Sequence, residues 1–130
     1  MVAADGCLVP VMAEDFGAQG LRKINRALAR VQAEANPSLR LLGYLVTHFN
    51  AKLAIHAAYC EQLRAAYGDM AFSATIPVAA DCKLAVTAGK PVGLLKPRSV
   101  AARAIAALAV ELLAGAGAGE GEGAPRKEVA

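Results

Sequence analysis

The chain has 130 residues, of which 56% are hydrophobic, and its formal net charge is +3. This length allows one domain, and a chain this apolar must either bury its surface well or have it covered by a partner. The mild positive charge permits contact with nucleic acid, but it is too small to indicate such contact by itself.

The cysteines and the lengths of the apolar runs predict a cytoplasmic protein. Cys7, Cys60 and Cys82 are odd in number and widely spaced, which is typical of reduced thiols rather than of a disulfide framework. We expect them to be buried and unreactive. No apolar run has membrane-spanning length, and no charged leader precedes an apolar core. We therefore expect no membrane contact.

A first strand and a helix are predicted at the start of the chain. Residues 7–13 indicate a strand, although Pro10 lacks an amide donor and must lie near a strand end or beside an unpaired neighbour. Apolar residues at helical spacing then predict a crossover helix over 17–35, which Asn36-Pro37 ends. These apolar positions are Leu21, Ile24, Leu28 and Val31.

An almost unbroken apolar run at 41–47 predicts the central strand. A short run so rich in large apolar side chains is typical of a strand buried on both faces. Helical segments precede and follow it, so the order of elements predicts an α/β fold with a parallel sheet. Ligands bind beyond the carboxyl ends of such strands. The polar residues to inspect first are therefore Thr47, His48, Asn50 and Lys52.

Two further elements complete the predicted sheet. A second helix is expected from about Ile55 to the Gly68-Asp69 pair, and a third strand over 70–76 is closed by Pro77. The fold class is thus α/β, a partial parallel sheet of about three strands with crossover helices.

The end of the chain is predicted as helix and tail. A short helix over 81–87 precedes a break and an irregular stretch. Ser99 is the expected N-cap of the last helix. Residues 115–130 contain too few large apolar groups to fold, so we predict a disordered Gly/Ala/Glu-rich tail after an α/β unit over 1–114. The last helix is expected to face inward with Ala101, Ile105, Leu108 and Leu112.

Short motifs occur along the chain in a characteristic order. Residues 3–11 are AADGCLVPV and residues 43–52 are GYLVTHFNAK, followed by TIP at 75–77, AGKPV at 88–92 and KPRS at 96–99. Together they resemble the C-terminal half of a ParA/Soj-type partition ATPase, from a deviant-Walker P-loop family that positions plasmids and chromosomes. The resemblance covers residues 2–113 and depends on the series of motifs rather than on any one.

The resemblance implies the C-terminal half of a P-loop NTPase-like doubly wound fold, and for the family it implies ATP, Mg²⁺ and dimers. A Walker A motif surrounds phosphates with backbone amides and a lysine, and needs Gly, four residues, then Gly-Lys-Ser/Thr. Gly89-Lys90 has Leu84 at the required offset and is followed by Pro91, so it is not a P-loop. We expect a chain that begins after the catalytic half, with no catalytic residue, metal ligand or cofactor of its own.

Two sets of site residues follow from the resemblance. Three of them correspond to positions that border the adenine base in the family, and the alternative is that they are simply strand ends: Thr47, Pro77 and Val78. The others correspond to a DNA-contacting residue, Lys52, and a basic stripe that would add phosphate contacts, Arg22, Arg26 and Arg30. The alternative for the stripe is a solvated helix face. The chain departs from the family at Asn50, Val78 and Leu84.

His56 and Cys60 raise the possibility of a metal or nucleophile site. They are one helical turn apart, and His48 is nearby in sequence. A zinc site needs three or four ligands, however, and a single His and Cys on a helix are typical of packing or surface positions. We predict no metal site.

Two functions are consistent with these patterns. The first is a ParA-like chromosome or plasmid partitioning protein of the cytoplasm, nucleoid-associated where it binds DNA without sequence preference, with a ParB-like partner. The alternative is a non-enzymatic module that pairs with a full-length ParA-like ATPase. A membrane positioner is disfavoured because the Gly-rich tail cannot form a basic amphipathic helix. The open edge of half a sheet predicts self-association.

Overall fold

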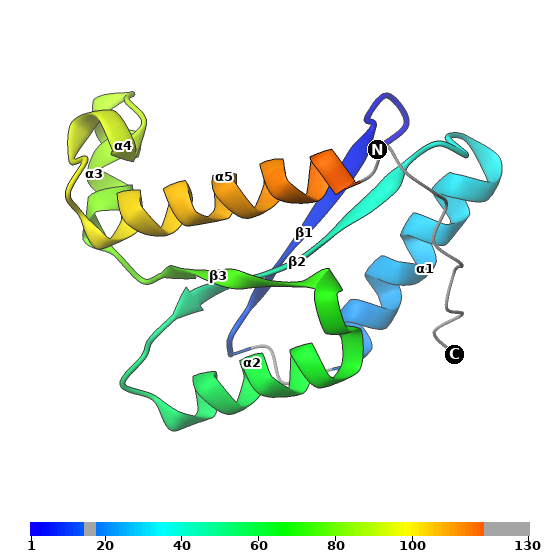
Figure 1. Cartoon of the computed structure of the whole chain (residues 1–130), viewed down its shortest axis with the longest axis horizontal. Helices are drawn as coiled ribbons and strands as arrows, with labels where there is room; N and C mark the ends of the chain where they lie inside the picture. The colour runs from blue at the N-terminus through cyan, green and yellow to red at the C-terminus, as the bar shows by residue number, and fades with distance from the viewer. Residues whose placement is uncertain (15–17, 119–130) are drawn as a thin grey trace.

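A computed structural model describes residues 1–14 and 18–118 of the chain (Figure 1). Strands and helices alternate in its first half, and three helices follow the last strand. The elements are β1 (Gly6–Met12), α1 (Ala18–Glu34), β2 (Arg40–Phe49), α2 (Ala54–Tyr67), the 3-10 turn η1 (Gly68–Met70), β3 (Ala71–Pro77), α3 (Ala80–Ala88), α4 (Val92–Leu95) and α5 (Val100–Ala118).

The three described strands form one parallel sheet in the order β1-β2-β3. This confirms the predicted α/β class and the partial parallel sheet. Pro10 pairs in register with Leu45 inside β1, not near a strand end. It is tolerated because β1 is an edge strand of this sheet, where a residue without an amide donor breaks no ladder on its outer side.

A bulge in β2 depends on a glycine. Cys7 pairs with Leu41, whereas the next residue, Leu8, pairs with Gly43, so the register shifts by one. Gly43 has φ 147°, and a Cβ placed there would lie 2.5 Å from the carbonyl oxygen of Met70. Glycine is required here by both its backbone angle and the close approach of η1.

One face of the sheet, which we call the covered face, packs against α1 and α2. Tyr44 is buried there, its hydroxyl donates a hydrogen bond to Asn25 Oδ1 at 2.6 Å, and its ring centroid is 4.5 Å from that of Tyr67. The side chains that form this core are Val9, Val11, Ala13, Leu21, Tyr44, Val46, Cys60, Leu63 and Ala71. Leu21 belongs to the apolar stripe predicted from the sequence of α1.

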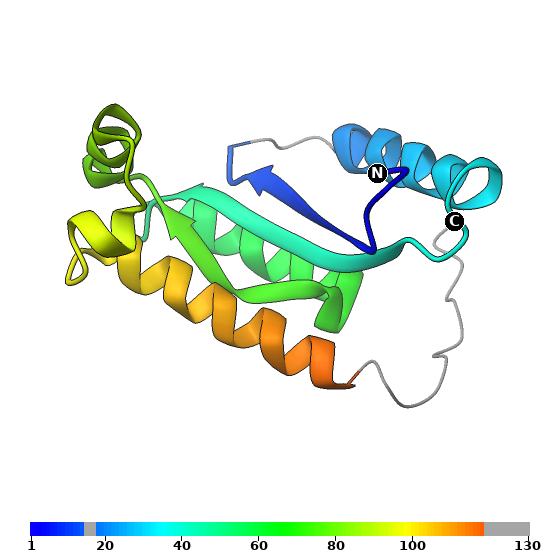
Figure 2. The same cartoon turned by 90° about the horizontal axis from the view of Figure 1, so that it is seen from above.

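The opposite face, which we call the open face, is covered only in part. Figures 1 and 2 show α5 on the other side of the sheet from α2, where it packs along β3. Strand alternation places Leu8, Pro10 and Met12 on this face, and Met12 is 44% exposed. Leu42, the bulged residue of β2, is 40% exposed beside Gly6. The prediction that the whole run 41–47 is buried on both faces is therefore wrong: its buried part is 43–46.

The last helix confirms one sequence expectation and corrects another. Ser99 Oγ accepts a hydrogen bond from the Ala102 amide at 3.1 Å, which is the predicted N-cap. Ala101 is fully buried and Leu108 and Leu112 are half-buried, as predicted, but Ile105 is 43% exposed. The side of α5 that meets β3 also includes the half-buried Glu111, a charged residue that a search for apolar spacing does not identify.

Two further boundaries differ from the sequence-based prediction. The short helix α4 occupies part of the stretch predicted as irregular, and a small second core joins it to α3 and α5 through Ala85, Val92 and Ala101. Helix α5 continues to Ala118, so residues 115–118, predicted as the start of the tail, are helical. Alanine's high helix propensity allows this extension despite the interleaved glycines. The rest of the predicted tail, 119–130, lies outside the described residues.

Among the described residues, no helix is both long enough and apolar enough to span a bilayer.

Candidate functional site

The loop after β2 presents Lys52 at the carboxyl edge of the sheet. The strand ends at Phe49, and Asn50 then folds the chain back on itself: its Oδ1 accepts the Lys52 amide at 3.0 Å, and its carbonyl accepts the Leu53 amide at 3.0 Å. This is an Asx-turn, in which a side chain replaces a backbone acceptor. The Lys52 residue at its tip is exposed. An ordered turn therefore holds the lysine that the sequence motif pointed to.

His56, near the start of α2, holds this loop through a hydrogen bond to its backbone. Its Nδ1 accepts the backbone amide of Asn50 at 2.9 Å, and its Nε2 lies 4.0 Å from Glu14 Oε1. The imidazole is 2% exposed and lies against the Phe49 ring, with centroids 6.1 Å apart. The sequence predicts a packing or surface role for His56; it is a packing residue that also makes a specific polar contact.

Backbone geometry at the end of β2 is unusual. His48 has φ 53°, the left-handed region that non-glycine residues seldom adopt. Its side chain is exposed, while Phe49 beyond it turns back towards the core. The two histidines of the chain thus lie in one short segment but in opposite environments.

The three residues predicted near a nucleotide base lie at the carboxyl ends of β2 and β3. Thr47 Oγ1 donates to the Val11 carbonyl at 3.2 Å, so its hydroxyl is already engaged across to β1. Pro77 pairs in register with Phe49, and the Val78 amide donates to the Phe49 carbonyl at 3.3 Å. Val78 is 66% exposed. The structure therefore brings these residues to one edge of the sheet.

The basic stripe of α1 is exposed, opposite the buried Leu21 and Leu28. Arg30 Nε donates to the Glu34 carboxylate at 3.1 Å, an i to i+4 pair of the kind found on the solvated helix face that was the alternative for this stripe. Within the described residues, neither Arg22 nor Arg26 forms an ion pair of this kind.

Lys52 and the α1 stripe do not form one patch. Figures 1 and 2 share the horizontal long axis of the molecule, and in both views α1 lies towards one end while the loop from β2 to α2 lies towards the other. The loop that carries Lys52 is thus separated in space from the helix that carries the three arginines of the DNA prediction. Any joint contact with a nucleic acid would have to run along the molecule.

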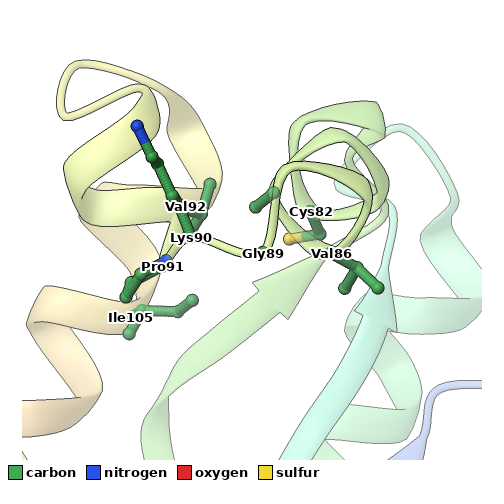
Figure 3. Close-up of a pocket in the computed structure, with 8 residues that line it drawn as sticks. Cys82, Val86, Gly89, Lys90, Pro91, Val92 and Ile105 are labelled. Atoms are coloured by element: carbon green, nitrogen blue, oxygen red, sulfur yellow. The ribbon is translucent and has the colours of Figure 1, made fainter.

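Two hollows in the described part of the chain are lined by residues outside both predicted sites. The first, of about 350 Å³, opens between α3, α4 and the start of α5, as Figure 3 shows. Its lining is apolar apart from Lys90, and Cys82 and Val86 face Pro91 and Ile105 across it. Gly89 closes α3 in the left-handed conformation, φ 62°. Neither hollow is lined by a residue of the base-proximal or DNA-contact sets.

The second hollow, of about 370 Å³, surrounds a carboxylate that sequence reasoning missed. Both oxygens of Glu111 accept backbone amides of β3, from Ser73 at 2.9 Å and Ala74 at 2.6 Å. Consecutive residues of a regular strand point their amides in opposite directions, and β3 is irregular here. Arg64 donates to the Ser73 carbonyl at 3.3 Å from α2. Glu111 therefore satisfies the unpaired amides of the irregular part of β3.

Cysteines and metal ligands provide no further chemistry in the described residues. All three cysteines are free, as predicted, and within 1–14 and 18–118 no three His, Cys, Asp or Glu side chains gather into a metal site. Burial raises the pKa of the Cys60 thiol, an effect that nearby Arg64 partly opposes. A protonated, buried thiol is a poor nucleophile. The expectation that all three cysteines are buried is wrong for Cys7 and Cys82, which are only partly buried.

Comparison with known proteins identifies the relatives. The chain is 36% identical over 114 residues to the chromosome-partitioning ATPase Soj of Thermus thermophilus, an alignment that covers 88% of this chain and 46% of Soj. It is 31% identical over 113 residues to the chromosome partitioning protein ParA of Caulobacter vibrioides, covering 87% of this chain and 42% of that protein. The chain is of the ParA/Soj type.

This ParA/Soj-type chain is also 28% identical over 114 residues to the sporulation initiation inhibitor protein Soj of Bacillus subtilis, covering 88% of this chain and 45% of that protein. The chain thus spans less than half the length of these curated relatives. No protein-family model matches the sequence. The homology confirms the family that the order of short motifs suggested, and it agrees with the three parallel strands and intervening helices of the structure.

Proposed function

We propose that this ParA/Soj-type chain acts in chromosome partitioning and that its own contribution is non-specific contact with DNA through Lys52. The observation that carries the proposal is the ordered turn at 50–53, which holds an exposed lysine at the carboxyl edge of the sheet. An ammonium group on an ordered loop can contact a DNA phosphate, and such a contact does not depend on the base sequence. The identity with Soj and ParA proteins connects this contact to partitioning.

The arginine stripe supports a second, weaker contact. Arg22 and Arg26 lie on the exposed face of α1, whereas Arg30 forms an ion pair with Glu34. Because the stripe lies at the other end of the molecule from Lys52, we propose that it adds phosphate contacts along a longer stretch of duplex. We expect Arg22 and Arg26 to contribute more than Arg30.

ATP and Mg²⁺ belong to the family, and the described residues do not fit a triphosphate. The Gly89-Lys90 pair lies at the C-terminal end of α3, where the helix dipole repels anions, instead of at a helix N-terminus. We propose that Thr47, Pro77 and Val78 contribute at most to the base side of a nucleotide site. The chain alone is then inactive as an ATPase.

A second candidate function is pairing with a full-length ParA-like subunit. The exposed Met12 and Leu42 on the open face favour it, since a partner that covers them gains apolar burial. A ParB-like protein is the other partner that the family suggests. We place the protein in the cytoplasm, associated with the nucleoid when it binds DNA.

The test of DNA contact compares Lys52→Glu with the matched control Lys83→Glu, which makes the same charge change at an exposed position of α3. Retention on a random-sequence duplex is measured by fluorescence anisotropy as the salt concentration rises. We expect the parent and Lys83→Glu to bind weakly and to lose affinity with salt, and Lys52→Glu to lose at least about threefold more affinity at low salt. Equal binding by the two variants would exclude Lys52 as a contact.

The ATPase proposal has a separate test. Calorimetric titration of the chain with ATP and Mg²⁺ should show no binding in the micromolar range, because no phosphate cradle is present among the described residues. Magnesium-dependent micromolar binding would contradict it.

A further inference from the structure

His56 is, apart from Tyr44 with its hydroxyl, the one buried side chain with polar atoms among the described residues. A buried polar group is costly unless it is hydrogen-bonded. Its Nδ1 meets this requirement by accepting the amide of Asn50, the residue whose side chain in turn forms the turn around Lys52. A continuous chain of two hydrogen bonds therefore connects the core of α2 to the exposed lysine.

This bond requires a particular protonation state. A ring nitrogen that accepts a hydrogen bond carries no proton, so this bond requires an unprotonated Nδ1. The other ring nitrogen, Nε2, lies 4.0 Å from Oε1 of Glu14, which follows β1. Protonation of Nδ1 would set two donors, the ring N–H and the Asn50 N–H, against each other.

We propose that His56 is a positioning residue that holds the Lys52 loop through its neutral Nδ1, so that acidification loosens the loop. The inference rests on the proposed DNA contact for its functional consequence. The structural part of the inference, that the Asn50–His56 hydrogen bond depends on pH, can be tested without DNA.

The groups around the ring decide the direction of the effect. Glu14 is the charged residue that faces the ring, from just after β1, and its side chain is 65% exposed. Within α2, Cys60 lies one turn further on, and burial keeps its thiol neutral by raising its pKa. The Phe49 ring on the loop side carries no charge. The Asn50 amide needs a bare Nδ1 as its acceptor, so the bond is lost if Nδ1 takes up a proton.

The chain offers a matched internal control. His48 and His56 are its two histidines, and His48 is exposed. His48→Asn removes a titrating ring from the same segment, and asparagine tolerates the positive φ of that position. His56→Asn places an amide oxygen near the position of Nδ1 without titrating, whereas His56→Leu removes the acceptor.

The first measurement is hydrogen exchange of the Asn50 amide by NMR between pH 5 and 8, corrected for the intrinsic exchange rate. In the parent and in His48→Asn, we expect the protection factor of this amide to fall at least about tenfold from pH 8 to pH 5. His56→Asn should protect it equally at both pH values, and His56→Leu at neither. Protection that does not change with pH in the parent, or that falls equally in His56→Asn, would overturn the inference.

The second measurement is DNA affinity over the same pH range, expressed as the ratio of parent to His56→Asn so that the general gain in positive charge cancels. We expect the ratio to fall about threefold between pH 8 and pH 5. A constant ratio, with DNA bound by both proteins, would overturn the positioning role. A pH-dependent Asn50 amide in a chain that binds no DNA at any pH would support the fastening and overturn the proposed function instead.

Discussion

The two faces of the sheet differ in how their side chains are covered. On the covered face, α1 and α2 bury a continuous core around Tyr44 and Val46. On the open face, α5 follows β3 and leaves Met12 and Leu42 exposed. Both faces are made of similarly apolar residues, so composition does not account for the difference. It arises because the crossover helices of the described strands pack on one side of the sheet, and only α5 packs on the other.

The polar contacts follow the same division. On the covered side, the polar atoms of Tyr44 and His56 are hydrogen-bonded within the core. On the side of α5, Glu111 reaches the backbone of β3 from a partly exposed position. The covered face is thus held by apolar packing, and α5 is anchored to β3 partly by a carboxylate.

The largest expected effect compares one leucine from each face. Leu63→Ala removes a side chain that is 5% exposed in the core of the covered face, and should lower the free energy of unfolding by about 3 kcal/mol, in the range for buried leucines. Leu42→Ala on the open face should cost less than about 1 kcal/mol. Urea unfolding of both variants measures the difference. Equal costs would show that the open face is buried in solution.

Glu111→Ala tests the anchoring of α5. The change removes the acceptor of the partly buried Ala74 amide and of the exposed Ser73 amide, and should destabilise the chain by about 1 kcal/mol, because water can replace the acceptor at Ser73. Thermal and urea unfolding are the measurements. Glu61→Ala, at an exposed position of α2, is the matched control and should be near neutral. If both variants unfold alike, the carboxylate does not anchor the helix.

Self-association is expected to use the open face and the edge strand β1. Met12→Lys places a charge on both and should raise the dissociation constant of the self-associated form about tenfold. Leu113→Lys, which adds the same charge at an exposed apolar position of α5, should change it little. Sedimentation velocity over a concentration series distinguishes these outcomes. If the parent chain stays monomeric at every concentration, the prediction that the open face causes self-association is wrong.

The smallest effect concerns alkaline pH and belongs to the covered face. Burial raises the pKa of Tyr44, with Tyr67 adding to the shift and the Asn25 hydrogen bond opposing it, and burial likewise raises the pKa of Cys60. The folded chain therefore keeps these protons to higher pH than the unfolded chain. Stability is unaffected below the unfolded values and falls as pH rises past them, from about pH 9 upwards.

Thermal melting at pH 8 and pH 10.5 measures this loss. Cys60→Ala should lose less stability than the parent between the two pH values, because one of the two groups is gone. Cys7→Ala, which retains both groups, should follow the parent. If all three proteins lose the same stability between pH 8 and pH 10.5, the loss comes from groups other than Cys60.

The sequence by itself determined the local elements and the side of α1 that is buried. Leu21 and Leu28 repeat at the helical period, and the apolar run at 41–47 has strand length, so each element's type follows from interactions between near neighbours. The N-cap at Ser99 is equally local, since it joins residues three apart. The family too was accessible from the order of short motifs, which alignment with Soj and ParA confirmed.

Tertiary structure alone decided the contacts that cross the chain. Glu111 meets Ser73 and Ala74 across 38 and 37 residues, which no periodicity encodes, and Ile105 is 43% exposed although it repeats at helical spacing with the buried Ala101. The separation of Lys52 from the arginine stripe is likewise set by the direction of α1. His56 acts through a bond to Asn50 that forms only when β2 and α2 pack together. In each case the stabilising interaction joins two elements, so the sequence pattern within either element does not predict it.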